Sequence, residues 1–295
     1  MSKQVNILLQ TTIPYTEDDW HIGRFSLLAG HLRSITDDRG EPIYEVTMRD
    51  REAISGGDDD VLSTLDSSDF DQIWLFGLEV GDGLTTRECE AITRFRQRGG
   101  GILATRDHND MGASMCTIGG VGEAHYFHST QCDPDESRRC RDDNITLSVD
   151  WPNYHSGANG NFQRLDAAEH PLLLRADGSL IEHFPAHPHE GAVGAPAGAN
   201  ASVIATGKSL VTERPFNLVV AFENETDKHG NRLGRAIAES SFHHMVDYNW
   251  NTEMGCPSFV EEPPGDGHLR EAEKLDDVKR YLANAAAWLS GRRNT

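Results

Sequence analysis

Histidines grouped with carboxylates are the residues of this chain best suited to chemistry. Its 295 residues include 14 histidines. Three pairs of them are closely spaced: His125 with His128, His187 with His189, and His243 with His244. Imidazole nitrogens and carboxylate oxygens suit zinc, manganese or iron, and a catalytic site needs three protein ligands plus an open position. The sequence therefore predicts a divalent metal ion held by histidines of these pairs.

The strongest unit lies around Pro188, where two histidines are separated by one residue. The proline biases His187 toward extended backbone, so the side chains of His187 and His189 leave the same face of the chain and can converge on one ion. Glu190 points the other way unless the chain turns at the following glycine. The alternative is a pair of loop histidines hydrogen-bonded to backbone carbonyls, and this spacing alone leaves both interpretations open.

The other two pairs are open to structural explanations as well. His125 and His128 can share a helical face at the i, i+3 spacing, or cap a turn. His243 and His244 end a predicted strand, so only one of them can face a given side. His243 is the candidate ligand, and His244, with Asp247 three residues on, is the candidate proton relay. A hydrogen-bonded histidine at a strand terminus explains the same pattern.

Charged residues that follow a predicted strand over residues 102–105 are candidates for catalysis. Asp107 and Asp110 can act as general base or metal ligand, and with His108 they form a fourth group; Glu190 is a further candidate base. Arg106 carries a permanent positive charge that can stabilise an anion. The simpler interpretation is that the two aspartates cap the turn that follows.

Two stretches have the composition of a substrate-binding surface. Aromatic faces mixed with amides, hydroxyls and glycines can stack on and hydrogen-bond a sugar or another small polar molecule. The candidates are Trp151, Asn153, Tyr154, His155 and Asn159 in residues 150–161, and Trp20, His21 and Arg24 in residues 19–24. Arg24 is the candidate anion clamp. Packing of the aromatic rings against the loops is the structural alternative.

Alternating strands and helices in the first hundred residues must position these groups. Short apolar runs predict buried strands over residues 5–9, 44–48, 72–76 and 102–105. Capping boxes at Thr16 with Asp19, and at Thr85 with Glu88, predict the starts of two helices. This alternation predicts an α/β fold with a doubly wound, mostly parallel sheet, in which ligands bind beyond the carboxyl ends of the strands.

The middle of the chain has little periodicity. Residues 107–178 are rich in Gly, Asn, Asp and Pro, and this segment is too long for an idle connection. Strand-like runs resume at residues 201–206, 217–222 and 235–242, and residues 275–289 carry the apolar stripe of a helix. We expect one domain over residues 1–295 with a large loop-rich central insertion at about 107–178.

Four stretches give the chain a resemblance to a known family. They are residues 70–76 (FDQIWLF), 84–92 running into 99–103 (LTTRECEAI, GGGIL), 234–243 (GRAIAESSFH) and 287–289 (AWL). They resemble the trehalose-utilisation (ThuA-like) family of the class I glutamine amidotransferase-like superfamily, which implies a flavodoxin-like sheet. In amidotransferases of that superfamily the strand after the Gly-rich turn ends in an elbow that carries the nucleophilic cysteine. Here Arg106 or Asp107 stands in that place.

The missing cysteine changes the expected chemistry. A guanidinium is permanently protonated and is not a nucleophile, and an aspartate cannot form a thioester. The chain is therefore not expected to be a glutamine amidotransferase. Cys116 is a substitute nucleophile to consider, with His243 or His244 as its base, although a lone loop cysteine is usually an inert thiol.

Composition excludes several classes of partner. Against 27 Lys and Arg stand 47 Asp and Glu, a net charge of -20, which repels nucleic acid and anionic membrane alike. Five cysteines without a CxxC pair indicate neither a disulfide framework nor a zinc knuckle, so a reducing, cytoplasmic setting is expected. The GGVG segment at 119–122 lacks the lysine of a P-loop, so no nucleotide cofactor is expected.

The sequence thus predicts a metal-dependent enzyme of the hydrolase or lyase type that acts on a small polar substrate, such as a sugar derivative. A non-catalytic small-molecule binding or sensing protein that uses the same cleft is the main alternative. A Cys116-dependent hydrolase is the second. A homo-oligomer is compatible with each of these.

Overall fold

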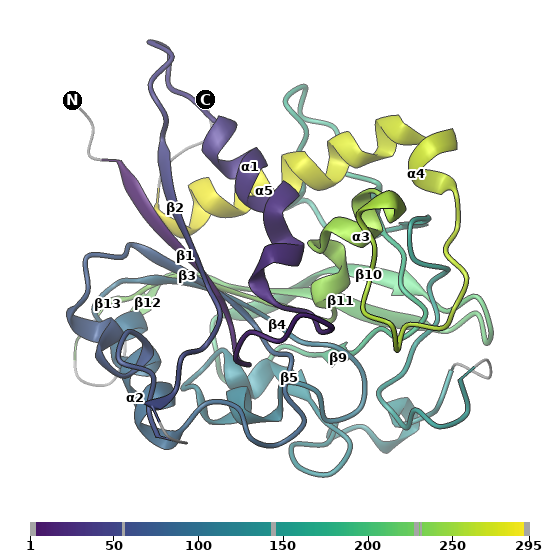
Figure 1. Cartoon of the computed structure of the whole chain (residues 1–295), viewed down its shortest axis with the longest axis horizontal. Helices are drawn as coiled ribbons and strands as arrows, with labels where there is room; N and C mark the ends of the chain where they lie inside the picture. Colours follow the sequence, from purple (N-terminus) through teal and green to yellow (C-terminus); the bar gives the residue numbers. More distant parts are fainter. Residues whose placement is uncertain (1–3, 55–56, 143–145, 227–229, 231, 292–295) are drawn as a thin grey trace.

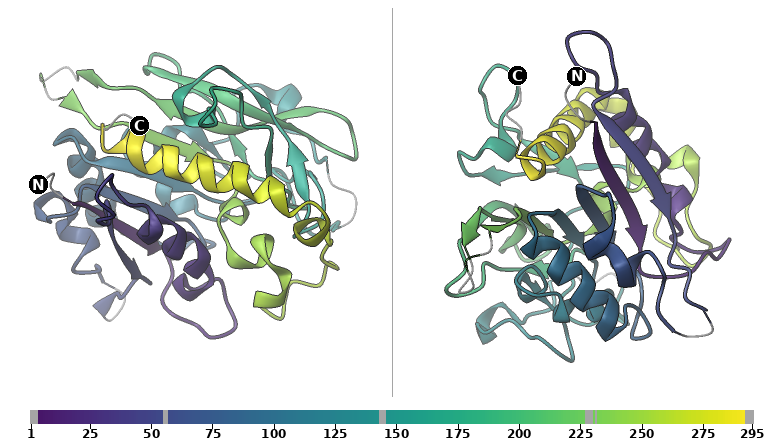
Figure 2. Two further views of the ribbon diagram at one scale, coloured as in Figure 1. Left: turned by 90° about the horizontal axis from the view of Figure 1, so that it is seen from above. Right: turned by 90° about the vertical axis from the view of Figure 1, so that its left-hand side faces the viewer.

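One sheet of eight strands organises the chain, with helices on both of its faces (Figures 1 and 2). The computed structural model describes residues 4–54, 57–142, 146–226, 230 and 232–291. The strands of this sheet are, in spatial order, β2 (Tyr44–Arg49), β1 (Val5–Thr11), β3 (Gln72–Phe76), β4 (Gly101–Thr105), β14 (Ala236–Glu239), β11 (Pro215–Phe222), β10 (Ala201–Lys208) and β7 (Asp166–Ala167). The helices are α1 (Ser26–Ser34), α2 (Thr86–Gln97), α3 (Asp247–Trp250), α4 (Gly267–Arg270) and α5 (Leu275–Leu289).

The first five strands of that order, from β2 to β14, are parallel, and the remaining pairs are antiparallel. Apolar residues on both faces explain why the central strands are buried. In β3, Trp74 and Phe76 pack into the core that includes α1 and α5, whereas Ile73 and Leu75 pack into the core beneath α2. The α/β fold with a mostly parallel, doubly wound sheet is therefore confirmed.

The second predicted helix start is confirmed and the first is wrong. Thr85 caps α2 as expected, because its side chain accepts from the Glu88 backbone N–H while the Glu88 carboxylate accepts from Thr85 N. The first helical turn begins only after His21, and α1 has no cap of its own. Asp247 supplies the cap from α3, where its carboxylate accepts from the backbone N–H groups of residues 26 and 27 at 3.0 and 2.8 Å.

The connection between β4 and β10 adds short strands to the sheet and beside it. One of them, β7, pairs with β10 and forms the edge of the sheet. The others form two-stranded pairs, β5 (His125–Tyr126) with β9 (Ala192–Val193) and β6 (Phe162–Arg164) with β8 (His183–Pro185). A further hairpin joins β12 (Glu225–Thr226) to β13 (Arg232–Leu233). The β6–β8 pair carries the segment with His187 and His189 toward the carboxyl end of β4.

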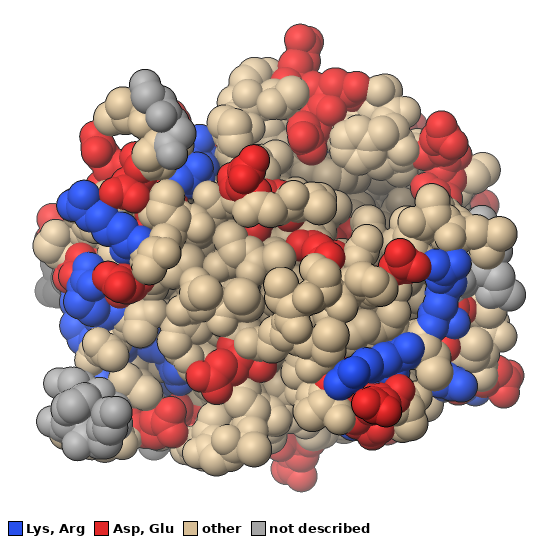
Figure 3. All heavy atoms as spheres, turned by 90° about the horizontal axis from the view of Figure 1, so that it is seen from below, with Lys and Arg blue, Asp and Glu red and all other residues tan. Residues whose placement is uncertain are grey.

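Acidic side chains dominate the charged surface. On the face shown in Figure 3, Asp and Glu are scattered across the molecule, whereas Lys and Arg gather toward its edges. Among the described residues, no helix is both long enough and apolar enough to cross a bilayer.

Candidate functional site

Asp107 is the centre of a buried histidine cluster at the carboxyl end of β4. Its Oδ2 atom lies 3.0 Å from His108 Nδ1, 3.3 Å from His187 Nε2 and 3.7 Å from His243 Nε2. Its other carboxylate oxygen accepts from Ser241 Oγ at 2.9 Å. These groups come from three parts of the chain, and each part is more than fifty residues from the next along the sequence.

The fold explains why these segments meet. Strands β4 and β14 are parallel neighbours with Thr105 opposite Glu239, so their carboxyl ends lie side by side. The turn after β14, Phe242–His244, is a 3₁₀ turn capped by Ser241 and presents His243 to Asp107. His187 arrives from the segment after β8, and its ring stacks on that of His243 with centroids 3.5 Å apart.

Two asparagines fix the orientation of the stacked rings. Asn249 Nδ2 donates to the backbone oxygen of Ala186 at 2.8 Å, an atom that can only accept, and also to Asn159 Oδ1 at 3.1 Å. The Oδ1 of each asparagine therefore faces a ring nitrogen: His243 Nδ1 at 3.1 Å and His187 Nδ1 at 2.8 Å. Both Nδ1 atoms carry a hydrogen, and both Nε2 lone pairs are directed at the Asp107 carboxylate.

The protonation states make these groups ready to bind a cation. Burial lowers the pKa of His187 to about 4, only partly opposed by Asp107, and burial together with His187 holds the pKa of His243 well below its ordinary value. Burial alone would raise the pKa of Asp107, but His187 and His108 outweigh it and keep that pKa well below the usual range. With the ring hydrogens on Nδ1, two imidazole lone pairs face the Asp107 carboxylate, an arrangement that a cation between them would stabilise.

The spacing of the donors fits a metal ion. Two ligand atoms at about 2.1 Å from a zinc ion, at the tetrahedral angle, lie about 3.4 Å apart. The distances of 3.0 and 3.3 Å from Asp107 to His108 and His187 are slightly shorter than that separation. Ligand atoms of these three residues all lie within 4.8 Å of one another. Asp107, His108 and His187 are therefore the candidate metal ligands, and His243 lies beside them.

A cavity of about 600 Å³ opens onto this cluster. Its polar side is formed by the cluster itself with Asn159 and His189, and Trp20 contacts the His243 ring at a centroid distance of 4.9 Å. The remaining wall is partly apolar and partly acidic and comes from residues far apart in the sequence: Met111, Thr146, Leu147, Ser148, Val149, Phe259, Val260, Glu261 and Glu262.

His189 forms a second histidine–carboxylate pair on the cavity wall. Asn153 Nδ2 donates to the Val149 backbone oxygen at 3.2 Å, so its Oδ1 accepts from His189 Nδ1 at 3.0 Å. His189 Nε2 lies 2.9 Å from Glu262 Oε1, which also accepts from Thr146 Oγ1 at 2.6 Å. Burial would raise the pKa of Glu262, but Thr146 and His189 lower it to about 2. Both ring nitrogens of His189 therefore face side-chain oxygens.

His244 and Glu190 lie in a different buried network, away from the cavity. His244 lies between two carboxylates, with Nδ1 3.2 Å from Glu239 and Nε2 3.3 Å from Glu190. Burial would lower the pKa of His244, but Glu190 and Glu239 raise it to about 10. Tyr281 donates to Glu239, and Gln163 donates to Glu190 at 2.6 Å. This network surrounds a charged imidazolium. Neither Glu190 nor His244 is among the residues that line the cavity.

The two arginines expected to bind an anion are both occupied by backbone oxygens. Arg106 is fully buried, donates to the carbonyls of residues 108, 109, 111 and 126, and lies over the Phe127 ring. Burial lowers its pKa to about 9. Arg24 donates to the carbonyls of Asp19 and Gly255 at 2.7 and 3.2 Å. Arg106 thus shapes the loop that carries His108, and neither guanidinium lines the cavity.

Several other sequence candidates lie outside the cluster. His125 is in strand β5 rather than a helix, so the shared helical face with His128, one of the two alternatives for this pair, does not form. His128 Nδ1 contacts the Trp151 backbone oxygen at 3.1 Å. The Asp110 carboxylate accepts from the Ser129 N–H and hydroxyl at 2.9 and 2.7 Å, and thus holds the turn.

The aromatic candidates mostly serve packing. Trp151 and Tyr154 are buried in the core, where Tyr154 stacks on Phe216. His21 is the capping acceptor for the first helical turn, and His155 lies near the loop at Leu210, whose N–H donates to its backbone oxygen. Of the expected substrate contacts, only Trp20 and Asn159 line the cavity. Asn153 does not line it but contacts the ring of His189, which does.

Asn249 and Glu262 belong to the site but were not identified from sequence. Asn249 sits in a four-residue helix six residues after His243, a spacing that carries no recognised motif. Glu262 lies in an irregular segment before α4, and only the fold brings it to His189. Spacing alone gave no signal for either residue.

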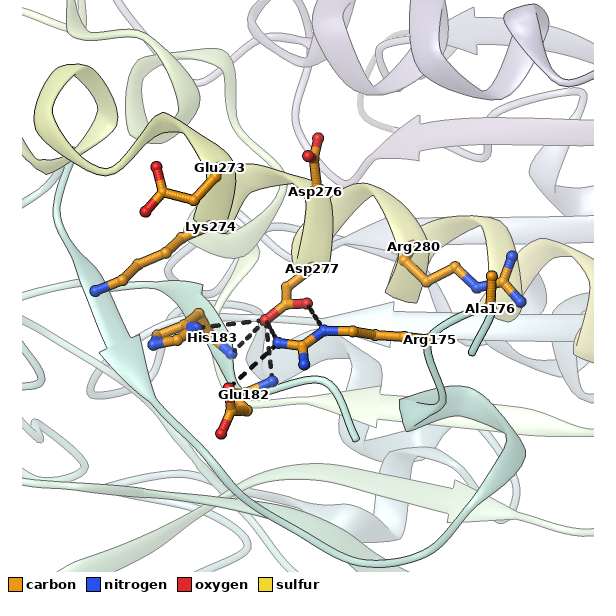
Figure 4. A pocket seen from close by; sticks show the side chains of 9 residues that line it. All are labelled: Arg175, Ala176, Glu182, His183, Glu273, Lys274, Asp276, Asp277 and Arg280. Atoms are coloured by element: carbon orange, nitrogen blue, oxygen red, sulfur yellow. Dashed lines mark hydrogen bonds and ion pairs between the residues drawn. The ribbon is translucent and has the colours of Figure 1, made fainter. Parts of the chain in front are cut away.

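A second hollow, of about 520 Å³, lies over the start of α5 and is structural in character (Figure 4). Asp277 accepts there from Arg175 Nε at 2.6 Å and from the backbone N–H groups of Glu182 and His183 at 3.0 and 3.2 Å. The dashed lines of Figure 4 converge on this carboxylate. The Asp277 carboxylate therefore holds the segment around Glu182 and His183, which precedes the candidate site in the chain, against α5.

Replacing Asp277 with alanine should lower the free energy of unfolding by about 2 to 3 kcal/mol, because several donors lose a charged acceptor. Urea denaturation measures the change. The neighbouring Asp276→Ala, which removes an exposed carboxylate from the same helical turn, is the matched control and should cost well under half as much. Equal effects of the two variants would show that Asp277 does not fasten the segment.

Replacing Asn249 with alanine should weaken divalent-metal binding by about ten- to a hundredfold, since the groups that orient metal-binding histidines contribute at this scale. Calorimetric titration of chelator-treated protein with Zn²⁺ measures the affinity. Asn251→Ala is the control, because Asn251 caps the next turn and does not contact the stacked rings. Unchanged zinc affinity in Asn249→Ala would contradict the orienting role.

The backbone at the end of β4 also differs from a nucleophile elbow. Such an elbow places its nucleophile on a sharp, strained turn between strand and helix. Among the described residues other than glycine, a positive φ occurs at Asn109 and Glu213 but at neither Arg106 nor Asp107. The residues that occupy the expected position of the cysteine are therefore unstrained.

Comparisons with known proteins identify the fold. No protein-family model matches the chain, and no curated protein matches it either. A ThuA-like protein from Parabacteroides merdae aligns over 99% of this chain and 92% of its own, at 14% identity and a TM-score of 0.52. The N-terminal domain of mmIFT52 aligns over 96% and 97%, at 12% identity and a TM-score of 0.54. Together with the doubly wound sheet, these matches show that the chain has the fold of ThuA-like proteins.

Proposed function

We propose that the protein is a divalent-metal-dependent enzyme of the hydrolase or lyase type that acts on a small polar substrate in the cavity beside Asp107. The observation that carries the proposal is the convergence of ring nitrogens of His108, His187 and His243 on one buried carboxylate oxygen, at 3.0, 3.3 and 3.7 Å. Two of these nitrogens present lone pairs, so the cluster has the form of a ligand set. Zinc, manganese and iron suit such donors.

In this proposal, different residues bind the ion and transfer protons. Asp107, His108 and His187 would hold the ion, and Asn159 keeps the His187 ring in the required orientation. The bound ion supplies polarisation of a substrate oxygen or a lowered pKa of water. His189, with its proton held against Glu262, is placed on the cavity wall to give that proton to a leaving group.

Exclusion of bulk water supports this assignment. Asp107, His187 and His243 are each no more than 3% exposed, so charges in the cluster act in a medium of low effective dielectric constant. Trp20 closes one side of the cluster by its edge-on contact with His243. An ion bound in this cavity would therefore interact strongly with a polarised bond of the substrate.

The cysteine-dependent alternative receives no support from the surroundings of Cys116. Burial raises the pKa of its thiol above the ordinary value, which is opposite to the activation that a nucleophilic cysteine needs. We propose no role for this cysteine in catalysis.

The test is a metal titration followed by a substrate panel. Chelator-treated protein is titrated with Zn²⁺, Mn²⁺ and Fe²⁺, and each loaded form is offered small amides, esters, lactones and sugar derivatives. We expect one ion per chain and turnover that disappears on chelation. Failure to bind any of the three ions would contradict the proposal, and tight ion binding without turnover would favour a non-catalytic binding protein.

A further inference from the structure

The cavity has an unusual charge balance for a site that takes small polar molecules. Its lining includes three carboxylates, those of Asp107, Glu261 and Glu262, and among the described residues no Lys or Arg lines it. A site that binds phosphate or carboxylate normally supplies Arg, Lys or a helix N-terminus to the anion. In this cavity a phosphate or carboxylate group would instead face acidic side chains, which repel it.

The nearest guanidinium groups do not change that balance. Arg24 approaches the Trp20 ring at 5.9 Å, but it donates to the backbone oxygens of Asp19 and Gly255. Arg106 donates to three carbonyls of its own loop and to that of Tyr126 in β5. Turning either group toward a ligand would leave backbone carbonyl oxygens without their donors, which is unfavourable where those oxygens are buried.

The two glutamates lie on the cavity wall with an apolar surface beside them. Glu262 directs its Oε1 atom to His189 and Thr146 and is partly exposed on the cavity wall. Glu261 is exposed at the same wall. Leu147 and Phe259, 67% and 56% exposed, also line the cavity. A ligand therefore meets carboxylates and a hydrocarbon surface together.

We infer that the substrate is a small organic cation or N–H-rich neutral molecule, in which an amine, amidine or guanidine group binds Glu261 and Glu262 and a short apolar segment packs on Leu147 and Phe259. The inference deepens the proposed function and rests on it for the location of the reacting bond near Asp107. It predicts that the metal-free cavity binds phosphorylated and carboxylated sugars more weakly than cations. The net charge of -20 over the chain favours the approach of cations as well.

The test compares benzylamine, benzyl alcohol and benzoate, three probes of matched size whose charge differs. Binding is measured by calorimetry at neutral pH in chelator-treated protein, because benzoate can bind a metal ion directly. We expect benzylammonium to bind at least tenfold more tightly than benzoate, with benzyl alcohol between them. A tenfold preference corresponds to about 1.4 kcal/mol.

Three variants assign the preference to the cavity. Glu262→Gln should reduce benzylammonium affinity by about tenfold and Glu261→Gln by about threefold. The charge of Glu262 contributes more because Glu262 is less exposed to water than Glu261. Glu253→Gln, which removes an acidic side chain outside the cavity, should leave the affinity unchanged. Equal losses in all three variants would show that the overall charge, and not the cavity, sets the preference, and would overturn the inference.

The outcome separates this inference from the proposed function. Cation preference in the metal-free protein, together with failure to bind any divalent ion, would leave the inference standing while the metal-dependent function fails. Benzoate binding as tightly as benzylammonium, or no saturable benzylammonium binding, would overturn the inference even where one metal ion binds per chain.

Discussion

Asp107→Asn is expected to weaken divalent-metal binding by at least a hundredfold. The substitution keeps the size of the side chain but removes the charge on the oxygen around which the ring nitrogens of His108, His187 and His243 gather. A neutral amide oxygen is a far weaker ligand for zinc, manganese or iron than a carboxylate. Calorimetric titration of chelator-treated protein measures the affinity, and turnover should be lost with it.

Asp110→Asn is the matched control for this experiment. Asp110 lies three residues further along the same loop and bonds to Ser129. This variant should bind metal as the wild type does. The unfolding free energy of Asp107→Asn should not fall by more than about 1 kcal/mol, because the amide is less costly to bury than a carboxylate that lacks its cation. Unaltered zinc affinity in a folded Asp107→Asn protein would remove Asp107 from the ligand set.

His244→Ala is expected to have the largest effect on stability. His244 is 2% exposed and lies between the carboxylates of Glu190 and Glu239. Removing the imidazolium leaves two buried carboxylates without their positive partner, a change that costs about 3 to 5 kcal/mol. Urea denaturation at neutral pH measures the loss. His21→Ala, a change in a partly exposed histidine at the start of the first helical turn, is the control and should cost about 1 kcal/mol.

The pH dependence of unfolding provides a second readout for His244. Its pKa is raised from 6.5 to about 10 in the folded protein by Glu190 and Glu239, which outweigh burial. A raised folded-state pKa contributes stability that is complete below the unfolded value and is lost as pH rises through the folded value. Wild-type protein should therefore lose this contribution between about pH 6.5 and pH 10, and His244→Ala should show a flatter profile there. Parallel profiles of the two proteins would contradict the charged state of His244.

The sheet could be predicted from sequence because its signals are local. Strand β3 was predicted with its observed bounds from an apolar run, and α2 from the capping box of Thr85 and Glu88. The start of α1 was missed because its cap, Asp247, comes from another part of the chain. Short-range patterns cannot indicate a cap that only tertiary structure supplies.

The candidate site could likewise be predicted only where its signals are local in the sequence. Asp107 and His187 attracted attention from residue type and position, and the fold brings both to one cavity. His125 and His128 had an equally suggestive spacing, but the pairing of β5 with β9 decides their geometry, and β9 lies more than sixty residues away. Asn159, expected to contact substrate, lines the cavity and also holds a histidine ring, a role that only the partners of its amide reveal.

Arg106 shows how burial changes the meaning of a residue type. From sequence it was a candidate to stabilise an anion, since it follows a strand at the favoured end of the sheet. The structure places its guanidinium among four backbone oxygens and over the Phe127 ring. A long side chain that points back into its own loop is not distinguishable from one that points into a cleft until the loop is seen.

The most direct test of the metal site is anomalous diffraction from crystals grown with Zn²⁺ and measured at the zinc absorption edge. We predict one strong peak per chain, about 2.1 Å from Asp107 Oδ2 and from His187 Nε2, with His108 Nδ1 as a third ligand. No peak at Asp107, or zinc bound only at another part of the chain, would contradict the account.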